Sequence, residues 1–151
     1  MKGWLLDTKV VAEIGRLAGE PRVHAWAAAQ DERRLFLSVL TLGEIEKGIH
    51  LLPDGDQRRA RHEAARAALA ARFAGRVLPV TEAVARRWGA IAGEIRRRTG
   101  QSPSVVDTLL AATAIEAGLY LATRNVTDVS GSGAAVFNPW TDDPTRLPLV
   151  R

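Results

Sequence analysis

Short apolar runs alternate along the chain with longer segments in which apolar residues recur about every three or four positions. The runs are typical of buried strands, and the longer pattern is typical of one face of a helix. We expect strands at residues 3–6, 35–38, 76–80, 119–122 and 134–137. We expect helices at residues 10–17, from 21 through 26, from 41 onward, at 57–73, from 81 through 95 and at 104–115.

Residues that favour helix ends set several of these boundaries. Thr41 is a predicted N-cap, with Glu44 at the capping-box position that follows it. Thr81 and Ser104 are predicted N-caps of two later helices, and Gly118 is expected to end the second of these.

The alternation of strands and helices predicts an α/β fold with a mainly parallel central sheet covered by helices on both faces. Residues 1–151 are expected to form a single domain, because 151 residues suffice for one sizeable core. An irregular C-terminal tail is expected from about residue 138, where prolines are frequent and periodicity is weak.

Composition narrows the class of protein. Apolar residues make up 46% of the chain and charged residues 25%, which is ordinary for a globular protein. No apolar run reaches the roughly 18 residues of a membrane-spanning helix, so no membrane association is expected. The absence of cysteine excludes disulfides, iron–sulfur clusters and thiol catalysis, and together with the lack of a secretory signal it favours a cytoplasmic location.

The chain is basic, with a formal net charge of +4 and a pI near 10.3. Arginines dominate the positive charge, and a guanidinium is well suited to contact phosphate groups. This composition indicates either a polyanionic partner such as nucleic acid or a solvated, arginine-rich surface without a partner.

Four acidic residues stand beside apolar segments: Asp7, Glu44, Asp107 and Asp128. A carboxylate next to a core segment is costly unless it is paired or binds a cation. Ligands of parallel sheets bind beyond the carboxyl ends of the strands, so these residues are expected to meet at one edge. Oxygen ligands suit Mg²⁺ or Mn²⁺. Each residue also has a structural alternative, namely an N-cap at Asp7, a capping box at Glu44, a helix first turn at Asp107 and a turn at Asp128.

Four segments carry a family resemblance: residues 5–13 (LLDTKVVAE), 38–48 (SVLTLGEIEKG), 104–114 (SVVDTLLAATA) and 122–129 (ATRNVTDV), with the ending Asn138-Pro139-Trp140. In order and spacing they resemble PIN-domain proteins of the VapC/FitB type. The resemblance implies a Mg²⁺- or Mn²⁺-dependent ribonuclease that serves as the toxin of a toxin–antitoxin pair. It also implies an RNA substrate, a small DNA-binding antitoxin as partner, and a homodimer.

The resemblance to PIN-domain proteins implies a role for each acidic residue. Asp7 and Asp107 are expected to be direct metal ligands, Glu44 to bind directly or through water, and Asp128 to hold a ligand water or a second ion. The residues expected to orient ligands or to contact substrate are Thr8, Thr123, Arg124 and Asn125. A catalytically silent PIN module that binds RNA or a partner protein is the alternative.

Two positions depart from the family pattern. Lys9 stands where relatives usually have asparagine, and its side chain would contact a phosphate, lower the negative charge of the site or extend into solvent. Asn125 stands where some relatives carry a carboxylate, so that Asp128, one turn later, is expected to serve instead.

An apolar stripe is available for association. Its members are Val84, Trp88, Ile91 and Ile95. We expect part of the apolar surface formed by this stripe and the alanine-rich helices to form a homodimer and part to receive an antitoxin segment, with burial of all of it in the core as the alternative.

Overall fold

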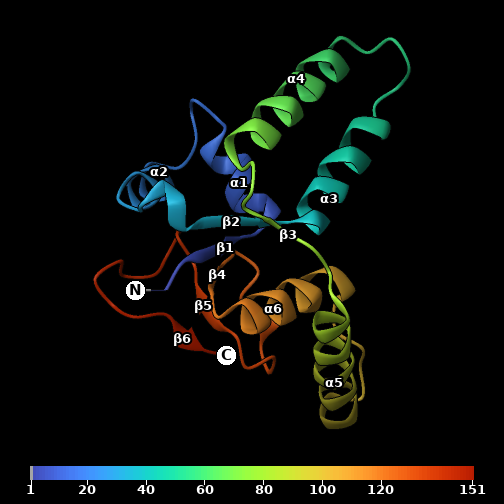
Figure 1. The fold of residues 1–151 in the computed structure, drawn as a ribbon, viewed down its shortest axis with the longest axis vertical. Helices are drawn as coiled ribbons and strands as arrows, with labels where there is room; N and C mark the ends of the chain where they lie inside the picture. The colour runs from blue at the N-terminus through green and yellow to red at the C-terminus, as the bar shows by residue number, and fades with distance from the viewer. Residues whose placement is uncertain (1) are drawn as a thin grey trace.

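Six strands form one sheet in the computed structural model, which describes residues 2–151 (Figure 1). The strands are β1 (Trp4–Leu6), β2 (Leu35–Ser38), β3 (Val77–Leu78), β4 (Tyr120–Ala122), β5 (Ala135–Phe137) and β6 (Leu149–Val150). Their order across the sheet is β3-β2-β1-β4-β5-β6. The first five strands pair in parallel, and only β6 pairs antiparallel, with β5. The prediction of a mainly parallel sheet is confirmed.

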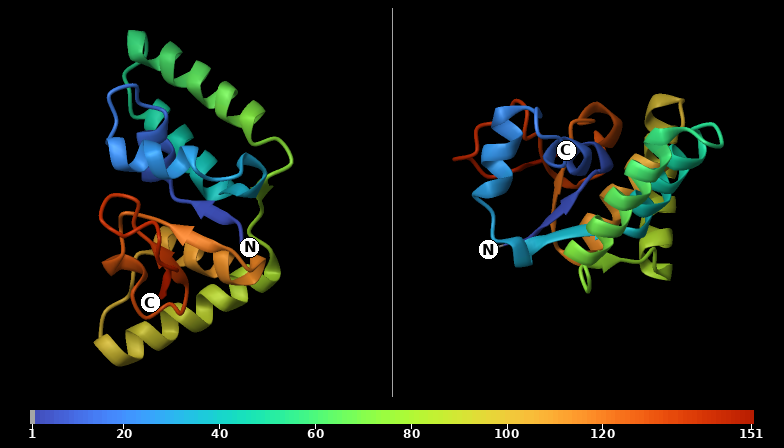
Figure 2. Two further views of the ribbon diagram at one scale, coloured as in Figure 1. Left: turned by 90° about the vertical axis from the view of Figure 1, so that its left-hand side faces the viewer. Right: turned by 90° about the horizontal axis from the view of Figure 1, so that it is seen from above.

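Helices cover both faces of this sheet (Figure 2). They are α1 (Thr8–Ile14), α2 (Pro21–Ala28), α3 (Val39–His50), α4 (Gln57–Arg72), α5 (Glu82–Thr99) and α6 (Val105–Ala117). Short 3-10 helices lie at Glu32–Arg34 and Thr127–Val129. Helices α1 to α4 lie on one side of the sheet, and α5 and α6 lie on the other. The helices α3 and α4 form a hairpin that projects away from the strands (Figure 1).

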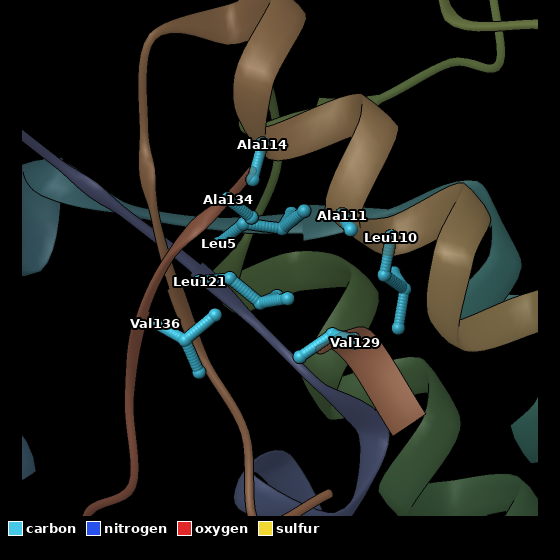
Figure 3. Close-up of a cluster of buried hydrophobic side chains, with 8 residues drawn as sticks. All are labelled: Leu5, Leu110, Ala111, Ala114, Leu121, Val129, Ala134 and Val136. Atoms are coloured by element: carbon cyan, nitrogen blue, oxygen red, sulfur yellow. The ribbon is translucent and has the colours of Figure 1, made fainter. Parts of the chain in front are cut away.

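Alternation along the strands separates two cores. Leu5 and Val136 both pair in register with Leu121, and all three side chains pack against α6 (Figure 3). Leu6 and Phe137 pack on the opposite face, in a core shared with α1 and α2. Because the central strands are apolar on both faces, their polar residues come where the strands end.

Two predicted helix boundaries are wrong. The helix α3 begins at Val39, because the hydroxyl of Ser38 accepts a hydrogen bond from the backbone N–H of Leu40 at 3.0 Å. The predicted cap Thr41 is therefore buried inside the helix, and Glu44 completes no capping box. The helix α1 ends at Ile14, and Leu17, expected on its apolar face, is fully exposed at 106%.

The apolar stripe of α5 is core. Val84, Ile91 and Ile95 are buried in a cluster with Ala112 of α6. The indole N–H of Trp88 donates to the hydroxyl of a threonine in α6 at 3.0 Å. For Val84, Ile91 and Ile95 the alternative of burial in the core is confirmed, whereas Trp88 is only partly buried.

The C-terminal tail contains one element that the sequence pattern did not predict. Strand β6 adds to the edge of the sheet through β5, although its two residues are exposed. Within residues 2–151, the helices include none that combines the length and apolar character needed to cross a membrane.

Candidate active site

Asp7 lies at the carboxyl end of β1, where the central strand meets α1. Its backbone N–H donates to the carbonyl of Ala122 in the neighbouring strand at 3.0 Å, so the residue is fixed beside β4. Asp7 is 4% exposed. Its side chain makes no capping hydrogen bond to α1, although the residue holds the N-cap position. The carboxylate instead accepts a hydrogen bond from the hydroxyl of Thr123 at 2.8 Å. Asp7 thus occupies the N-cap position of α1, and a backbone hydrogen bond with Thr8 is one of the causes that lower its pKa.

Burial raises the pKa of Asp7 above its usual value, because the charged form loses water. The hydrogen bond from Thr123 acts in the opposite direction and lowers this pKa. The negative charges of Asp107 and Glu44 raise it again. Three of the four predicted carboxylates are thus close enough to interact electrostatically, although they come from β1, α3 and α6.

Glu44 and Thr8 form the second part of this group. The hydroxyl of Thr8, the first residue of α1, donates to Glu44 Oε1 at 2.7 Å. The same hydroxyl oxygen lies 3.3 Å from the hydroxyl oxygen of Thr41, which is buried in α3. This hydrogen bond from Thr8 holds the exposed carboxylate of Glu44 next to the end of β1.

Asp107 and Asp128 are less constrained. Asp107 lies in the first turn of α6, and its backbone N–H donates to the capping hydroxyl of Ser104 at 3.5 Å. Asp128 is exposed in the 3-10 helix Thr127–Val129, where its backbone N–H donates to the carbonyl of Asn125 at 3.2 Å. Throughout residues 2–151, neither carboxylate accepts a hydrogen bond. Both side chains thus keep their oxygen atoms available.

A hydrogen-bonded chain connects Asp7 with the loop after β4. Thr123, which donates to Asp7, accepts a hydrogen bond from the backbone N–H of Asn125 at 3.0 Å. The side-chain oxygen of Asn125 accepts one from Lys9 Nζ at 3.1 Å. Lys9 therefore reaches across to the rim of the carboxylate group. The sequence showed that Lys9 departs from the family pattern, but it did not show that Lys9 contacts Asn125.

Arg124, expected near a scissile phosphate, has a contact of its own. Its guanidinium lies over the ring of Trp140, 5.1 Å from the ring centre. The cation–π contact draws this exposed side chain toward the C-terminal tail.

The donor set suits a hard divalent ion. Carboxylate and hydroxyl oxygens are the groups that Mg²⁺ and Mn²⁺ prefer. Asp7 is deeply buried and has no cationic side chain paired with it among residues 2–151, so a bound cation would compensate its charge. As the side chains stand, residues 2–151 contain no group of three or more Asp, Glu or His gathered tightly enough to share one metal ion. Mutual repulsion of the carboxylates favours this separation when no cation neutralises them.

A groove of about 740 Å³ begins at Thr8 and runs between α1, α3 and α4. Its apolar lining includes Val11, Ile45 and Leu69, and three arginines are among its other residues. Because Thr8 also contacts Glu44, an occupant of this groove would lie next to the carboxylate group.

Comparison with known proteins identifies relatives of this chain. The family model described as the PIN domain matches residues 4–126. The toxin FitB of Neisseria gonorrhoeae is 36% identical over 141 residues, which cover 91% of this chain and 99% of that protein. The VapC ribonuclease Y4jK of Sinorhizobium fredii is 29% identical over 136 residues, covering 90% and 96%. A structure of FitAB bound to an IR36 DNA fragment superposes with a TM-score of 0.81 at 33% identity, covering 93% of this chain and 97% of that one.

Proposed function

Because this chain belongs to the PIN-domain family, we propose that it is a metal-dependent ribonuclease and the toxin of a toxin–antitoxin pair. The observation that carries the proposal is the buried carboxylate of Asp7 beside Asp107 and Glu44. Charge of one sign gathered at the end of a central strand is unfavourable for folding alone. It is favourable once a divalent cation binds there.

Each acidic residue has a role in this proposal. Asp7 and Asp107 would hold Mg²⁺ or Mn²⁺ directly, and Glu44 would bind it directly or through water. Asp128, on the adjacent 3-10 helix, would hold a ligand water or a second ion. When bound, the ion supplies a more acidic water and neutralises negative charge on a phosphodiester. Histidine is absent from this ligand set, which favours Mg²⁺ or Mn²⁺ over Zn²⁺.

The neutral residues keep the carboxylates in place. Thr123, the residue after β4, fixes one oxygen of Asp7, and Thr8 of α1 fixes Glu44. These contacts join elements that are distant in sequence, so they hold the site together across the edge of the sheet. Asn125 orients the hydroxyl of Thr123 through its backbone N–H.

The antitoxin is the proposed partner, and the groove beside Thr8 is its proposed binding surface. One of the similar structures is a FitAB complex on a DNA fragment, which supports a DNA-binding partner. The groove combines an apolar lining with Arg61, which forms no ion pair among residues 2–151, so an amphipathic segment with an acidic residue fits it. Binding there would cover Thr8 and restrict access to the carboxylates.

A homodimer and a cytoplasmic location complete the proposal. The dimer must use a surface other than the buried stripe of α5. Light scattering at high concentration should give the mass of a dimer, and a strict monomer would reject this part.

A catalytically silent PIN module that binds RNA or a partner is the second candidate. It is favoured by Lys9, which places a positive charge beside the site where relatives usually have asparagine. Isothermal titration with Mn²⁺ discriminates the two functions, because a silent module need not bind a divalent ion.

The decisive experiment is incubation with total RNA, with and without Mg²⁺ or Mn²⁺, followed by mapping of the cleaved ends. We expect metal-dependent cleavage by the wild type and none by Asp7→Asn. Asp54→Asn is the matched control, because Asp54 is exposed in the turn between α3 and α4 and pairs with Arg59 at the surface. RNA that stays intact with every metal would reject the nuclease function.

A further inference from the structure

Lys9 lies between the carboxylate group and the loop after β4. It is the second residue of α1, two positions after Asp7. Its side chain spans from α1 to Asn125, which is 116 positions away in the sequence, with 3.1 Å between Lys9 Nζ and the amide oxygen. Asn125 in turn donates its backbone N–H to Thr123, the hydrogen-bond donor to Asp7. The ammonium group is therefore placed by the same contacts that place the buried carboxylate.

The charge of Lys9 is not neutralised by this contact. The amide oxygen of Asn125 is neutral, and within residues 2–151 no carboxylate forms an ion pair with Lys9. Most of the ion pairs at the surface are made by arginines, for example by Arg58 with Asp56 at 2.8 Å and by Arg66 with Glu46 at 2.5 Å. An ammonium has three N–H donors, so two of those on Lys9 remain available.

The hydrogen bond to Asn125 alone is a weak reason to order a lysine. Fixing this long side chain costs conformational entropy of a size comparable to the gain from one exposed, neutral hydrogen bond. An anion that bridges to the same ammonium would add a stronger, charge-assisted contact. The neighbouring cation, Arg124, is drawn toward Trp140 instead.

We propose that Lys9 binds a backbone phosphate of the RNA strand at the rim of the active site, and that Asn125 positions its ammonium for this contact. This inference rests on the proposed ribonuclease function and adds a specific substrate contact to it. Lysine acts as a compact point charge toward phosphate, so the contact positions the strand without reading its sequence.

The test measures RNA binding rather than cleavage. A fluorescently labelled single-stranded RNA oligonucleotide is titrated with the protein in EDTA over a range of salt concentrations. Each phosphate contact on a single strand contributes about 0.7 to the slope of log affinity against log salt. Lys9→Gln should weaken binding severalfold at low salt and lower the magnitude of this slope by about 0.7. Lys9→Arg should restore both quantities.

Lys2→Gln is the matched control. Lys2 precedes β1 and stacks over Tyr120, 5.1 Å from the ring centre, so it lies at the end of β1 opposite to Asp7. The same loss of charge there should leave the salt slope unchanged. Lys9 is exposed, so the melting temperature of Lys9→Gln should match that of the wild type and exclude misfolding.

The outcomes separate this inference from the function on which it rests. A wild type that binds and cleaves RNA, together with a Lys9→Gln variant of unchanged affinity and slope, would overturn only the role of Lys9. Weaker binding with an unchanged slope would also overturn it, because the loss would not involve a phosphate. A wild type that neither binds nor cleaves RNA would overturn both.

Discussion

Replacing Thr123 with valine should destabilise the apo protein, because one hydroxyl holds both Asp7 and Asn125. Thr123 is 1% exposed. It donates to the Asp7 carboxylate at 2.8 Å and accepts from the Asn125 N–H at 3.0 Å. Valine has the same shape, so Thr123→Val removes these two hydrogen bonds without opening a cavity.

The magnitude follows from the two contacts. A hydrogen bond to a charged group contributes about 1.5–3 kcal/mol, and a neutral one about 0.5–1.5 kcal/mol. Because Asn125 is partly exposed and its N–H is able to bind water, we expect a loss of about 2–4 kcal/mol at neutral pH. A chain of this length loses about 2–4 °C in melting temperature per kcal/mol, which predicts a decrease of about 4–16 °C.

The loss should depend on pH. Burial raises the pKa of Asp7, and the Thr123 hydroxyl lowers it, so Thr123→Val raises it further. The stability contributed by a raised carboxyl pKa is complete below the pKa of the unfolded chain and is lost as pH rises through the folded pKa. The free energy of unfolding of the variant should therefore fall further below that of the wild type as pH rises from about 4 to 7.

Urea unfolding at both pH values measures this difference, with Thr113→Val as the matched control. Thr113 is 2% exposed, and its hydroxyl donates to the carbonyl of Leu109 within α6 at 2.8 Å. That carbonyl keeps its helical partner, so the control should change stability by about 1 kcal/mol or less. Equal losses in the two variants at pH 7, or a Thr123→Val loss that ignores pH, would refute the reasoning.

Three further predictions concern the carboxylates. Asp7→Asn and Asp107→Asn should abolish RNA cleavage and raise the melting temperature of the apo protein, since each removes one of several like charges; full activity in either variant would reject the ligand assignment. Mg²⁺ or Mn²⁺ should stabilise the folded wild type by about 2.7 kcal/mol at an ion concentration one hundred times the dissociation constant, and should therefore raise its melting temperature. A melting temperature that does not change in millimolar Mn²⁺ would contradict the site. In isothermal titrations Asp128→Ala should lose more Mn²⁺ affinity than Asn125→Ala, because a carboxylate binds a hard cation more strongly than an amide; the reverse order would assign the fourth position to Asn125.

The sequence predicted most helices and strands, because few residues near each helix start are good N-caps. Thr81 and Ser104 cap α5 and α6 as expected, with hydroxyls that accept from the N–H groups of Val84 and Asp107. The predicted start of α3 is wrong, because Ser38, at the end of the preceding strand, caps the helix in place of Thr41. Ser38 is the cap because strand β2 ends at this residue. The spacing of apolar residues does not show where the strand ends, since that depends on pairing within the sheet.

Some features of the site were likewise predictable from the sequence, and others were not. Asp7 was placed by a general rule, because residues that follow the central strands of a parallel sheet share one edge. The contact of Lys9 with Asn125 depends on how the loop after β4 folds back, and no local pattern specifies that geometry. The stripe on α5 shows the limit of periodicity, which identifies an apolar face but does not say whether a neighbouring helix or another chain covers it.

The distribution of charge strengthens the case for a cation at Asp7. Several surface carboxylates of this basic chain are paired with arginine, and hydrogen bonds from arginine lower the pKa of Glu32, of Glu46 and of Asp56, where Arg58 lowers the pKa to about 2. Among residues 2–151, Asp7 is the only buried acidic residue, and it has no ion-pair partner. Burial raises its pKa, and the negative charges of Asp107 and Glu44 raise it further. A fold with so many arginines available for pairing leaves its one buried carboxylate beside Asp107 and Glu44 instead. Such an arrangement is costly in the free protein and becomes favourable when a divalent ion binds, which is the property expected of a metal-dependent active site.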